Sequence, residues 1–216
     1  MGLFDGIAAA EPAVQSPAPG LTLLQGFALD RVGPLQRDLE AVVQRAPFRH
    51  MVTRGGYRMS VAMSNCGAQG WISDRRGYRY APLDPDTGHP WPAMPDSFRR
   101  LAVDAAAAAG FPTFAPDACL VNRYEPGARM TLHQDRNERD FSQPIVSVSL
   151  GVPATFLFGG AERTMKPLRL RLVHGDVVVW GGVARLYFHG VDRLRQDLHP
   201  VFGVQRINLT FRTAVA

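Results

Sequence analysis

Two histidines and one aspartate in the second half of the chain are residue types that together bind a transition metal. His133 and Asp135 are separated by one residue, and His189 follows well after them. Two imidazoles and one carboxylate form the facial triad that binds Fe(II) and leaves coordination positions open. Residues i and i+2 of a strand project from the same face, so His133 and Asp135 are expected to chelate from one strand. An open iron site of this kind is suited to oxidation chemistry.

A second His-x-Asp pair, His174-Gly175-Asp176, stands directly before the apolar run Val177–Trp180. Glycine followed by aspartate is typical of a turn. This pair is therefore predicted to be the turn that begins a strand and not a metal site. Because such short motifs also occur by chance, the triad alone remains a hypothesis.

The closing segment Arg206–Arg212 predicts a strand with two chemically different faces. Its residues alternate with a period of two, with Arg206, Asn208, Thr210 and Arg212 on one face and Ile207, Leu209 and Phe211 on the other. An ordinary surface strand would show the same alternation. Arginine, however, pairs with a carboxylate through its planar fork of donors. Beside an iron site, this polar face indicates a carboxylate co-substrate.

Several motifs carry a resemblance to one enzyme family through their order and spacing. They are Met51-Val-Thr-Arg-Gly-Gly-Tyr57, Trp91-Pro-Ala-Met-Pro95, Asn122-Arg-Tyr124, His133-Gln-Asp135, Ser147 to Gly151, His174 to Gly182, His189-Gly190 and Arg206 to Arg212. This set resembles the AlkB family of 2-oxoglutarate- and Fe(II)-dependent dioxygenases. The resemblance runs from about Ala46 to Arg212, and its two upstream motifs are specific to the bacterial AlkB type.

The resemblance implies a role for each matching residue. His133, Asp135 and His189 would be the Fe(II) ligands and the catalytic centre. Arg206 and Arg212 would bind 2-oxoglutarate, with Asn122, Tyr124 and Asn208 as polar neighbours. Trp71 and the His133 ring would sandwich the damaged base. The remaining substrate contacts would be Tyr78, Arg163, Met51, Thr53, Tyr57, Met59, Met63, Arg136, Asn137 and Glu138. Asn137 departs from the family pattern, in which Asp is usual, and this leaves the base preference open.

The implied activity is oxidative demethylation of N-alkylated bases, with 1-methyladenine and 3-methylcytosine in single-stranded DNA as substrates, and double-stranded DNA or RNA as further ones. 2-Oxoglutarate and O2 would be converted to succinate and CO2, and formaldehyde would be released, in a direct reversal of DNA damage. Aromatic residues interleaved with arginines between Phe48 and Tyr80 suit this substrate, because bases stack on aromatic rings while arginine meets phosphate. Without the resemblance, the same segment would be interpreted as an ordinary meander.

Two alternatives stay open at this point. A 2-oxoglutarate-dependent hydroxylase acting on a protein or a small molecule would keep the triad and Arg206 without needing Trp71 and Tyr78. A metal-free sandwich that only binds ligands would need neither iron nor co-substrate.

The predicted organisation is α+β, mainly β. Residues 1–20 are rich in proline and alanine and predict a flexible N-terminal arm before a single dioxygenase domain over 21–216. A strand is expected over Leu21–Phe27, and helices over Asp30–Arg45, capped by Asp30, and over Ser97–Ala109, a closely packed alanine-rich run. Short alternating strands from Ala118 predict a double-stranded β-helix, or jelly roll, over 118–213. The resemblance adds a nucleotide-recognition lid over 46–95.

Composition is consistent with this organisation. The chain has 216 residues, 46% hydrophobic and 20% charged, which suits one globular domain. The net charge of +5 permits a polyanionic partner such as DNA. Cys66 and Cys119 lack a C-x-x-C partner and are expected to be reduced, buried thiols. No signal peptide or membrane span is recognisable, so a cytoplasmic monomer without a membrane partner is expected.

Overall fold

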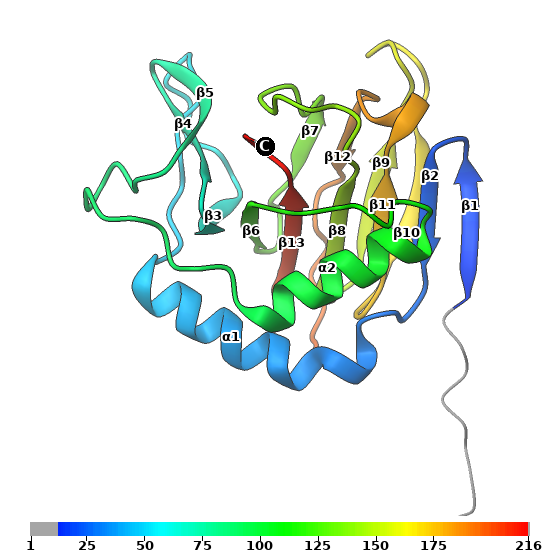
Figure 1. Cartoon of the computed structure of the whole chain (residues 1–216), viewed down its shortest axis with the longest axis horizontal. Coiled ribbons are helices and arrows are strands. Elements are labelled where there is room, and N and C mark those ends of the chain that lie inside the picture. Colours follow the sequence, from blue (N-terminus) through cyan, green and yellow to red (C-terminus); the bar gives the residue numbers. More distant parts are fainter. Residues whose placement is uncertain (1–12, 216) are drawn as a thin grey trace, which may run out of the picture.

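Two antiparallel sheets lie at the centre of the computed structural model, which describes residues 13–215 (Figure 1). The large sheet has the order β1 (Val14–Ala18), β2 (Leu21–Leu24), β11 (Val177–Trp180), β8 (Ile145–Gly151), β13 (Arg206–Arg212), β6 (Ala118–Tyr124) and β3 (Ala62–Gly67). The small sheet has the order β10 (Leu168–Leu172), β9 (Ala154–Phe158), β12 (His189–Val191) and β7 (Met130–His133). These sheets confirm the predicted jelly roll.

A separate hairpin pairs β4 (Gly70–Asp74) with β5 (Gly77–Ala81) and stands apart from the two sheets (Figure 1). Trp91 anchors this hairpin, because its indole N–H donates to the Ala81 carbonyl at 2.9 Å. The indole also packs so closely on Gly70 that a Cβ there would lie 2.3 Å from the ring. Glycine is therefore required at position 70, and the hairpin is held at its base.

Two helices cover the outer face of the large sheet (Figure 1). They are α1 (Val32–Arg45) and α2 (Asp96–Ala108), and both were predicted. Helix α2 presents alanines and Phe98 to the sheet, and Phe98 meets Phe211 of β13 edge to face at 6.1 Å. The predicted Asp30 cap is wrong, since a short 3-10 turn over Leu29–Arg31 precedes α1 and no side chain caps the helix. No helix of residues 13–215 has the length and apolar character needed to cross a membrane.

The N-terminal segment differs from its prediction. Val14–Ala18 forms β1 and pairs with β2, so the predicted arm over residues 1–20 is wrong for this part, while residues 1–12 lie outside the described residues. The strand expected over Leu21–Phe27 already ends at Leu24. It stops there because Gly26 turns with φ +66° and donates its N–H to the Asp176 carboxylate at 2.9 Å.

The second His-x-Asp pair is a turn, as predicted. Gly175 has φ +88°, which favours glycine, and the Asp176 carboxylate accepts the Val173 N–H at 2.9 Å just before β11. Each carboxylate oxygen of Asp176 thus accepts a hydrogen bond from a backbone N–H group. His174 uses Nδ1 to accept the Gly151 N–H at 3.1 Å. Both side chains of this pair therefore hold the turn in place.

His174 makes the stability of the protein depend on pH. Its ring lies 4.3 Å from the His199 ring, and partial burial together with His199 lowers the pKa of His174 below its ordinary value. A proton therefore favours the unfolded chain, and stability should fall as the pH drops below about 6.5. We expect a smaller loss of melting temperature on acidification in His174→Asn, whose amide oxygen keeps an acceptor for Gly151. Equal losses in the variant and the wild type would contradict this prediction.

The two cysteines are buried and free, as predicted. Cys66 of β3 and Cys119 of β6 stand directly opposite each other in the large sheet, and neither is exposed. Burial raises the pKa of the Cys119 thiol well above its ordinary value. A thiol is a poor nucleophile, so this pair is suited to packing and not to catalysis.

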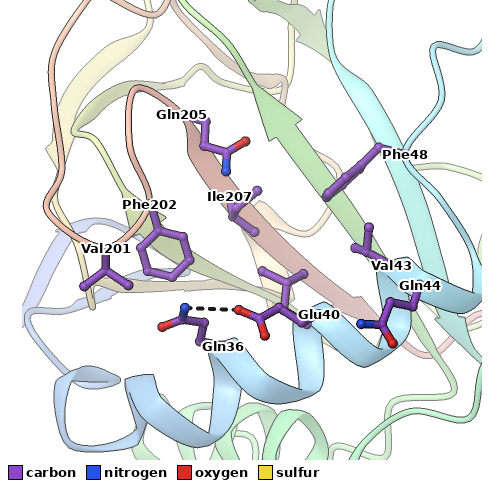
Figure 2. A pocket seen from close by; sticks show the side chains of 10 residues that line it. Gln36, Glu40, Val43, Gln44, Phe48, Val201, Phe202, Gln205 and Ile207 are labelled. Atoms are coloured by element: carbon purple, nitrogen blue, oxygen red, sulfur yellow. Dashed lines mark hydrogen bonds between the residues drawn. The ribbon is translucent and has the colours of Figure 1, made fainter.

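Strand β13 lies in the middle of the large sheet and presents its two faces to different layers. On the helix side, a pocket of about 390 Å³ lies between α1 and the segment that leads into β13, and Ile207 is part of its lining. Figure 2 shows the side chains that line it. Gln36 donates to Glu40 there at 3.1 Å, and Glu40 is the single ionisable group among the lining residues. His133 and His189 line a different cavity, on the polar face of β13.

Candidate iron and carboxylate site

His133 and His189 come together across two neighbouring strands. They are direct partners in the β7–β12 pair, with their ring centroids 4.5 Å apart. The register then shifts by one residue, because β7 uses three residues from His133 to Met130 where β12 uses two from His189 to Val191. Gly190 lies in this irregular stretch, where a Cβ would lie 2.6 Å from the Met130 carbonyl oxygen. Direct cross-strand partners project from the same face of a sheet, and both imidazoles line one cavity.

Asp135 completes the cluster from outside the sheet. The expectation that His133 and Asp135 chelate from one strand is wrong, because β7 ends at His133 and Asp135 lies in the loop that follows. Its Oδ1 is 3.7 Å from Nε2 of His133, and its Oδ2 is 3.7 Å from Nε2 of His189. One donor atom from each of the three residues lies within 4.8 Å of the others.

Both histidines are oriented by backbone carbonyls. Nδ1 of His133 bonds to the Thr131 carbonyl at 2.9 Å, and Nδ1 of His189 bonds to the Tyr187 carbonyl at 3.0 Å. A ring that donates from Nδ1 keeps its Nε2 lone pair for a metal. Loss of solvent and the neighbouring His189 ring lower the pKa of His133 to about 4, so this imidazole is neutral near pH 7.

The Asp135 carboxylate is charged and held by Arg212. Burial disfavours the carboxylate, but Arg212 and the two imidazoles outweigh burial and hold the pKa of Asp135 well below its ordinary value. Arg212 donates to Oδ2 from Nε at 2.8 Å, and its Nη2 forms an ion pair with the same oxygen at 2.6 Å. Two imidazoles and one carboxylate are the donor set of non-haem Fe(II) oxygenases, and these residues therefore fit Fe(II).

Arg206 is a buried cation that lacks a carboxylate partner within residues 13–215. It is 1% exposed, stacks on the Tyr124 ring at 5.1 Å and donates to Ser149 Oγ at 2.9 Å. Its Nε and Nη1 atoms are buried, and no described residue forms a hydrogen bond with them. Loss of solvent lowers the pKa of this guanidinium, so an anion beside it would be stabilised. The free donors therefore fit a carboxylate of 2-oxoglutarate.

The predicted polar neighbours line the same cavity. Asn122, Tyr124 and Asn208 lie around it together with both histidines, Arg206 and Arg212. Asn208 is held by Ser147 at 2.8 Å and by Thr210 at 2.9 Å, while the Asn122 side-chain oxygen is buried without a partner. Burial raises the pKa of Tyr124, so its phenol stays protonated. The cavity thus offers an arginine, an amide and a hydroxyl beside the metal-binding cluster.

Trp71 and Tyr78 form an aromatic stack on the β4–β5 hairpin. Their ring centroids are 5.6 Å apart, with an angle of 12° between the ring planes. Asn137, two residues beyond Asp135, accepts from the Trp71 indole N–H at 3.3 Å and donates to the Tyr78 carbonyl at 3.4 Å. Trp71, which was predicted to stack on the base, and Tyr78, a further predicted contact, are therefore connected to the loop that carries Asp135. An aspartate at position 137 could not make the second of these bonds.

The other predicted substrate contacts lie in several environments. Thr53 and Tyr57 close a turn through backbone and side-chain bonds, and Tyr57 is 78% exposed. Met51 and Met63 are buried in the core between the sheets, with Met63 completely so, and Met59 packs against them. Arg163 is exposed in the loop between β9 and β10, and Arg136 is exposed beside Gln134. The structure thus does not bring Met63 to the surface of a binding cleft.

Glu138, predicted as a substrate contact, is buried in a network that composition and spacing did not reveal. Its carboxylate accepts the Tyr80 hydroxyl at 2.6 Å and pairs with Arg185 at 3.2 Å. Asn65 was not predicted, and its amide holds both backbone groups of Trp71 at 3.0 Å. Tyr80, Glu138 and Arg185 are far apart in the sequence, and no strand or helix period links Asn65 to Trp71. Only the folded chain brings these groups together.

A pair of facing antiparallel sheets with a His-Asp-His cluster beside an arginine-lined cavity defines a class, the 2-oxoglutarate-dependent iron oxygenases. The model of the 2OG-Fe(II) oxygenase superfamily matches residues 20–212. The chain is 54% identical to the alpha-ketoglutarate-dependent dioxygenase AlkB of Escherichia coli strain K12, over 98% of each chain. It belongs to the AlkB family of this superfamily, and it is an Fe(II)- and 2-oxoglutarate-dependent dioxygenase. The metal-free sandwich is thereby excluded.

Two further relatives extend this comparison. The solved structure described as "The structure of OsALKBH1" matches with a TM-score of 0.81 and 31% identity, covering 93% of this chain and 100% of that one. The human protein named nucleic acid dioxygenase ALKBH1 is 32% identical, over 57% of this chain and 32% of its own length. The likeness to the solved structure confirms the fold over nearly the whole chain.

Proposed function

We propose that the protein removes methyl groups from N-alkylated bases, with 1-methyladenine and 3-methylcytosine in single-stranded DNA as preferred substrates, and with double-stranded DNA and RNA as further ones. The observation that carries this proposal is the Trp71–Tyr78 stack, which Asn137 connects to the Asp135 loop. A base that is flipped out of its strand needs an aromatic surface beside the reacting group. A base blocked by methylation on its pairing edge is also the easiest to flip.

Within this proposal, each group of site residues has a separate task. His133, Asp135 and His189 would hold Fe(II), which together with 2-oxoglutarate and O2 supplies the oxidation that releases the methyl group as formaldehyde. Arg206 would bind one carboxylate of 2-oxoglutarate through its free donors, with Asn122, Tyr124 and Asn208 beside it. Arg212 keeps Asp135 charged and would meet the other end of the co-substrate. The enclosing sheets would keep water from the reacting groups.

We also propose that residues 46–95 act as the nucleotide-recognition lid over a jelly-roll core of residues 118–213. Four arginines of this segment are exposed and make no ion pair within the described chain: Arg54, Arg58, Arg75 and Arg76. Exposed cations near the aromatic stack would attract the phosphates on either side of the flipped base. Arg163 and Arg136 would extend this contact from the core. We propose that the protein is a monomer and that it is located in the cytoplasm.

The decisive experiment is mass spectrometry of an oligonucleotide that carries one 1-methyladenine. Wild-type protein with Fe(II), 2-oxoglutarate and air is expected to remove one CH2 unit from its mass and to release formaldehyde. No loss is expected without 2-oxoglutarate or in Asp135→Ala. Asp192→Ala is the matched control, because this exposed aspartate pairs only with Arg169 and backbone near it.

Two outcomes would count against the proposal in different ways. Retention of the methyl group while 2-oxoglutarate is still converted to succinate would reject the nucleic-acid substrate. It would favour the alternative, a hydroxylase acting on a protein or a small molecule. Full activity in Asp135→Ala would reject the proposed metal site itself.

A further inference from the structure

Arg185 is a buried cation that binds the Asp135 loop at three points. It follows the short 3-10 turn Gly182–Ala184 and is 2% exposed. Its guanidinium donates from Nε to the Gln143 carbonyl at 2.9 Å, from Nη1 to the Asp135 carbonyl at 3.1 Å and from Nη2 to the Glu138 carboxylate at 3.2 Å. All three acceptors belong to the loop between β7 and β8, which contains one proposed metal ligand.

The same short segment leads directly to the second half of the metal-binding cluster. Leu186 follows Arg185, and its carbonyl accepts a hydrogen bond from the Gln134 side chain, next to Asp135. Tyr187 then supplies the carbonyl that orients the His189 ring. The residues from Arg185 to His189 are therefore bound to the Asp135 loop at one end and carry a proposed ligand at the other.

The charges around Arg185 are balanced within the protein. Glu138, whose side chain is 1% exposed, pairs with Arg185 on one side and lies 3.6 Å from Arg212 on the other. Tyr80 of the β4–β5 hairpin donates to the same carboxylate at 2.6 Å, and burial keeps this phenol protonated by raising its pKa. Two guanidiniums thus face two carboxylates, Asp135 and Glu138. A loop without strand pairing is held in place by this network.

We propose that Arg185 is a positioning residue for the iron centre, which fixes the Asp135 carboxylate relative to His189. Asp135 lies in a loop, where no strand pairing fixes its position. Arg185 fixes it instead, by donating a hydrogen bond to the Asp135 backbone carbonyl. Lysine cannot replace it, because an ammonium group lacks the planar fork that reaches three acceptors in different directions. Mutation of residues that orient a metal ligand typically lowers metal affinity by about 10- to 100-fold.

The test is Co(II) binding to full-length Arg185→Lys, measured by titration and by the visible spectrum of the bound ion. This variant keeps the charge that Glu138 needs, so its melting temperature should stay close to wild type. We expect its Kd for Co(II) to rise by about 10- to 100-fold, with an altered spectrum. Arg169→Lys is the matched control, because Arg169 is exposed and pairs with Asp192. This variant should leave the Kd for Co(II) and the spectrum unchanged.

A second variant keeps the test decisive if Arg185→Lys does not fold. The double variant Arg185→Met with Glu138→Gln removes both charges of the pair, leaves no buried ion unpaired and should weaken Co(II) binding to the same extent. Wild-type affinity and spectrum in a folded Arg185→Lys or in the double variant would overturn the inference. The inference rests on Asp135 being a metal ligand, and Asp135→Ala tests that separately: wild-type Co(II) affinity there would overturn the proposed metal site as well.

Discussion

Replacing Arg206 by methionine is expected to raise the KM for 2-oxoglutarate by about 30-fold or more, because removing one partner of a buried charge pair costs roughly 2–5 kcal/mol. The guanidinium is buried on Tyr124 with two donor atoms free, and no carboxylate of residues 13–215 pairs with it. The co-substrate would supply the missing anion. The KM is measured from succinate formation at increasing 2-oxoglutarate concentration.

The same variant has a second readout that does not depend on turnover. A ligand that binds only the folded state raises the melting temperature, and this rise with added 2-oxoglutarate should disappear in Arg206→Met. Without the co-substrate, the variant should melt close to wild type, because it loses an uncompensated buried cation. Arg123→Met is the matched control, since Arg123 stands opposite Ile207 and stacks on Phe48, on the helix side of the sheet. An unchanged KM in Arg206→Met would mean that 2-oxoglutarate binds elsewhere.

Replacing Trp71 by alanine is expected to lower kcat/KM for a methylated oligonucleotide by about 10- to 100-fold, since stacking of one base on an aromatic side chain contributes roughly 1–3 kcal/mol. The change also removes the indole N–H that bonds to Asn137. The metal-binding cluster and Arg206 are untouched, so 2-oxoglutarate should still be converted to succinate without the oligonucleotide. The two rates are measured on the same preparation.

Tyr78→Phe is the control that distinguishes loss of the stacking surface from general damage to the hairpin. It keeps the stacked ring and the backbone carbonyl that Asn137 binds, and its activity should stay near wild type. If Trp71→Ala removed methyl groups as fast as wild type, the base would not stack on this residue. The hydroxylase of a protein or a small molecule would then become the better explanation of the site.

The parts of this structure that the sequence predicts are those governed by a local period. The alternation in Arg206–Arg212 correctly separates the polar face beside the metal-binding cluster from the apolar face beneath the helices, because a period of two survives in any sheet. The turn at Gly175 is equally local. The two helices follow from apolar spacing and an alanine-rich run, and their bounds differ from the predicted ones by one or two residues.

The parts that the sequence does not predict depend on contacts between distant segments. Asp135 reaches the histidines from a loop, and its position is set by Arg212 and Arg185, which lie far along the chain. Asn65 holds Trp71, a near neighbour in the sequence, but through a side-chain bond that no helix or strand period predicts. The segment from Val14 was predicted to be an arm because its prolines and alanines do not alternate as strand residues do. It nevertheless pairs with β2 as the edge strand of the large sheet.

Asp135 pairs with Arg212, and Glu138 pairs with Arg185. These ion pairs bear on whether folding or metal binding comes first. In small zinc domains the ion itself neutralises its ligands, so the chain folds only when the metal arrives. Here the polypeptide carries its own counter-charges, and folding can be complete before iron is bound. Metal acquisition then becomes a reversible step of the finished protein, in which other divalent ions compete with Fe(II) for the same ligands. The supply of iron, more than the success of folding, would set how many molecules are active.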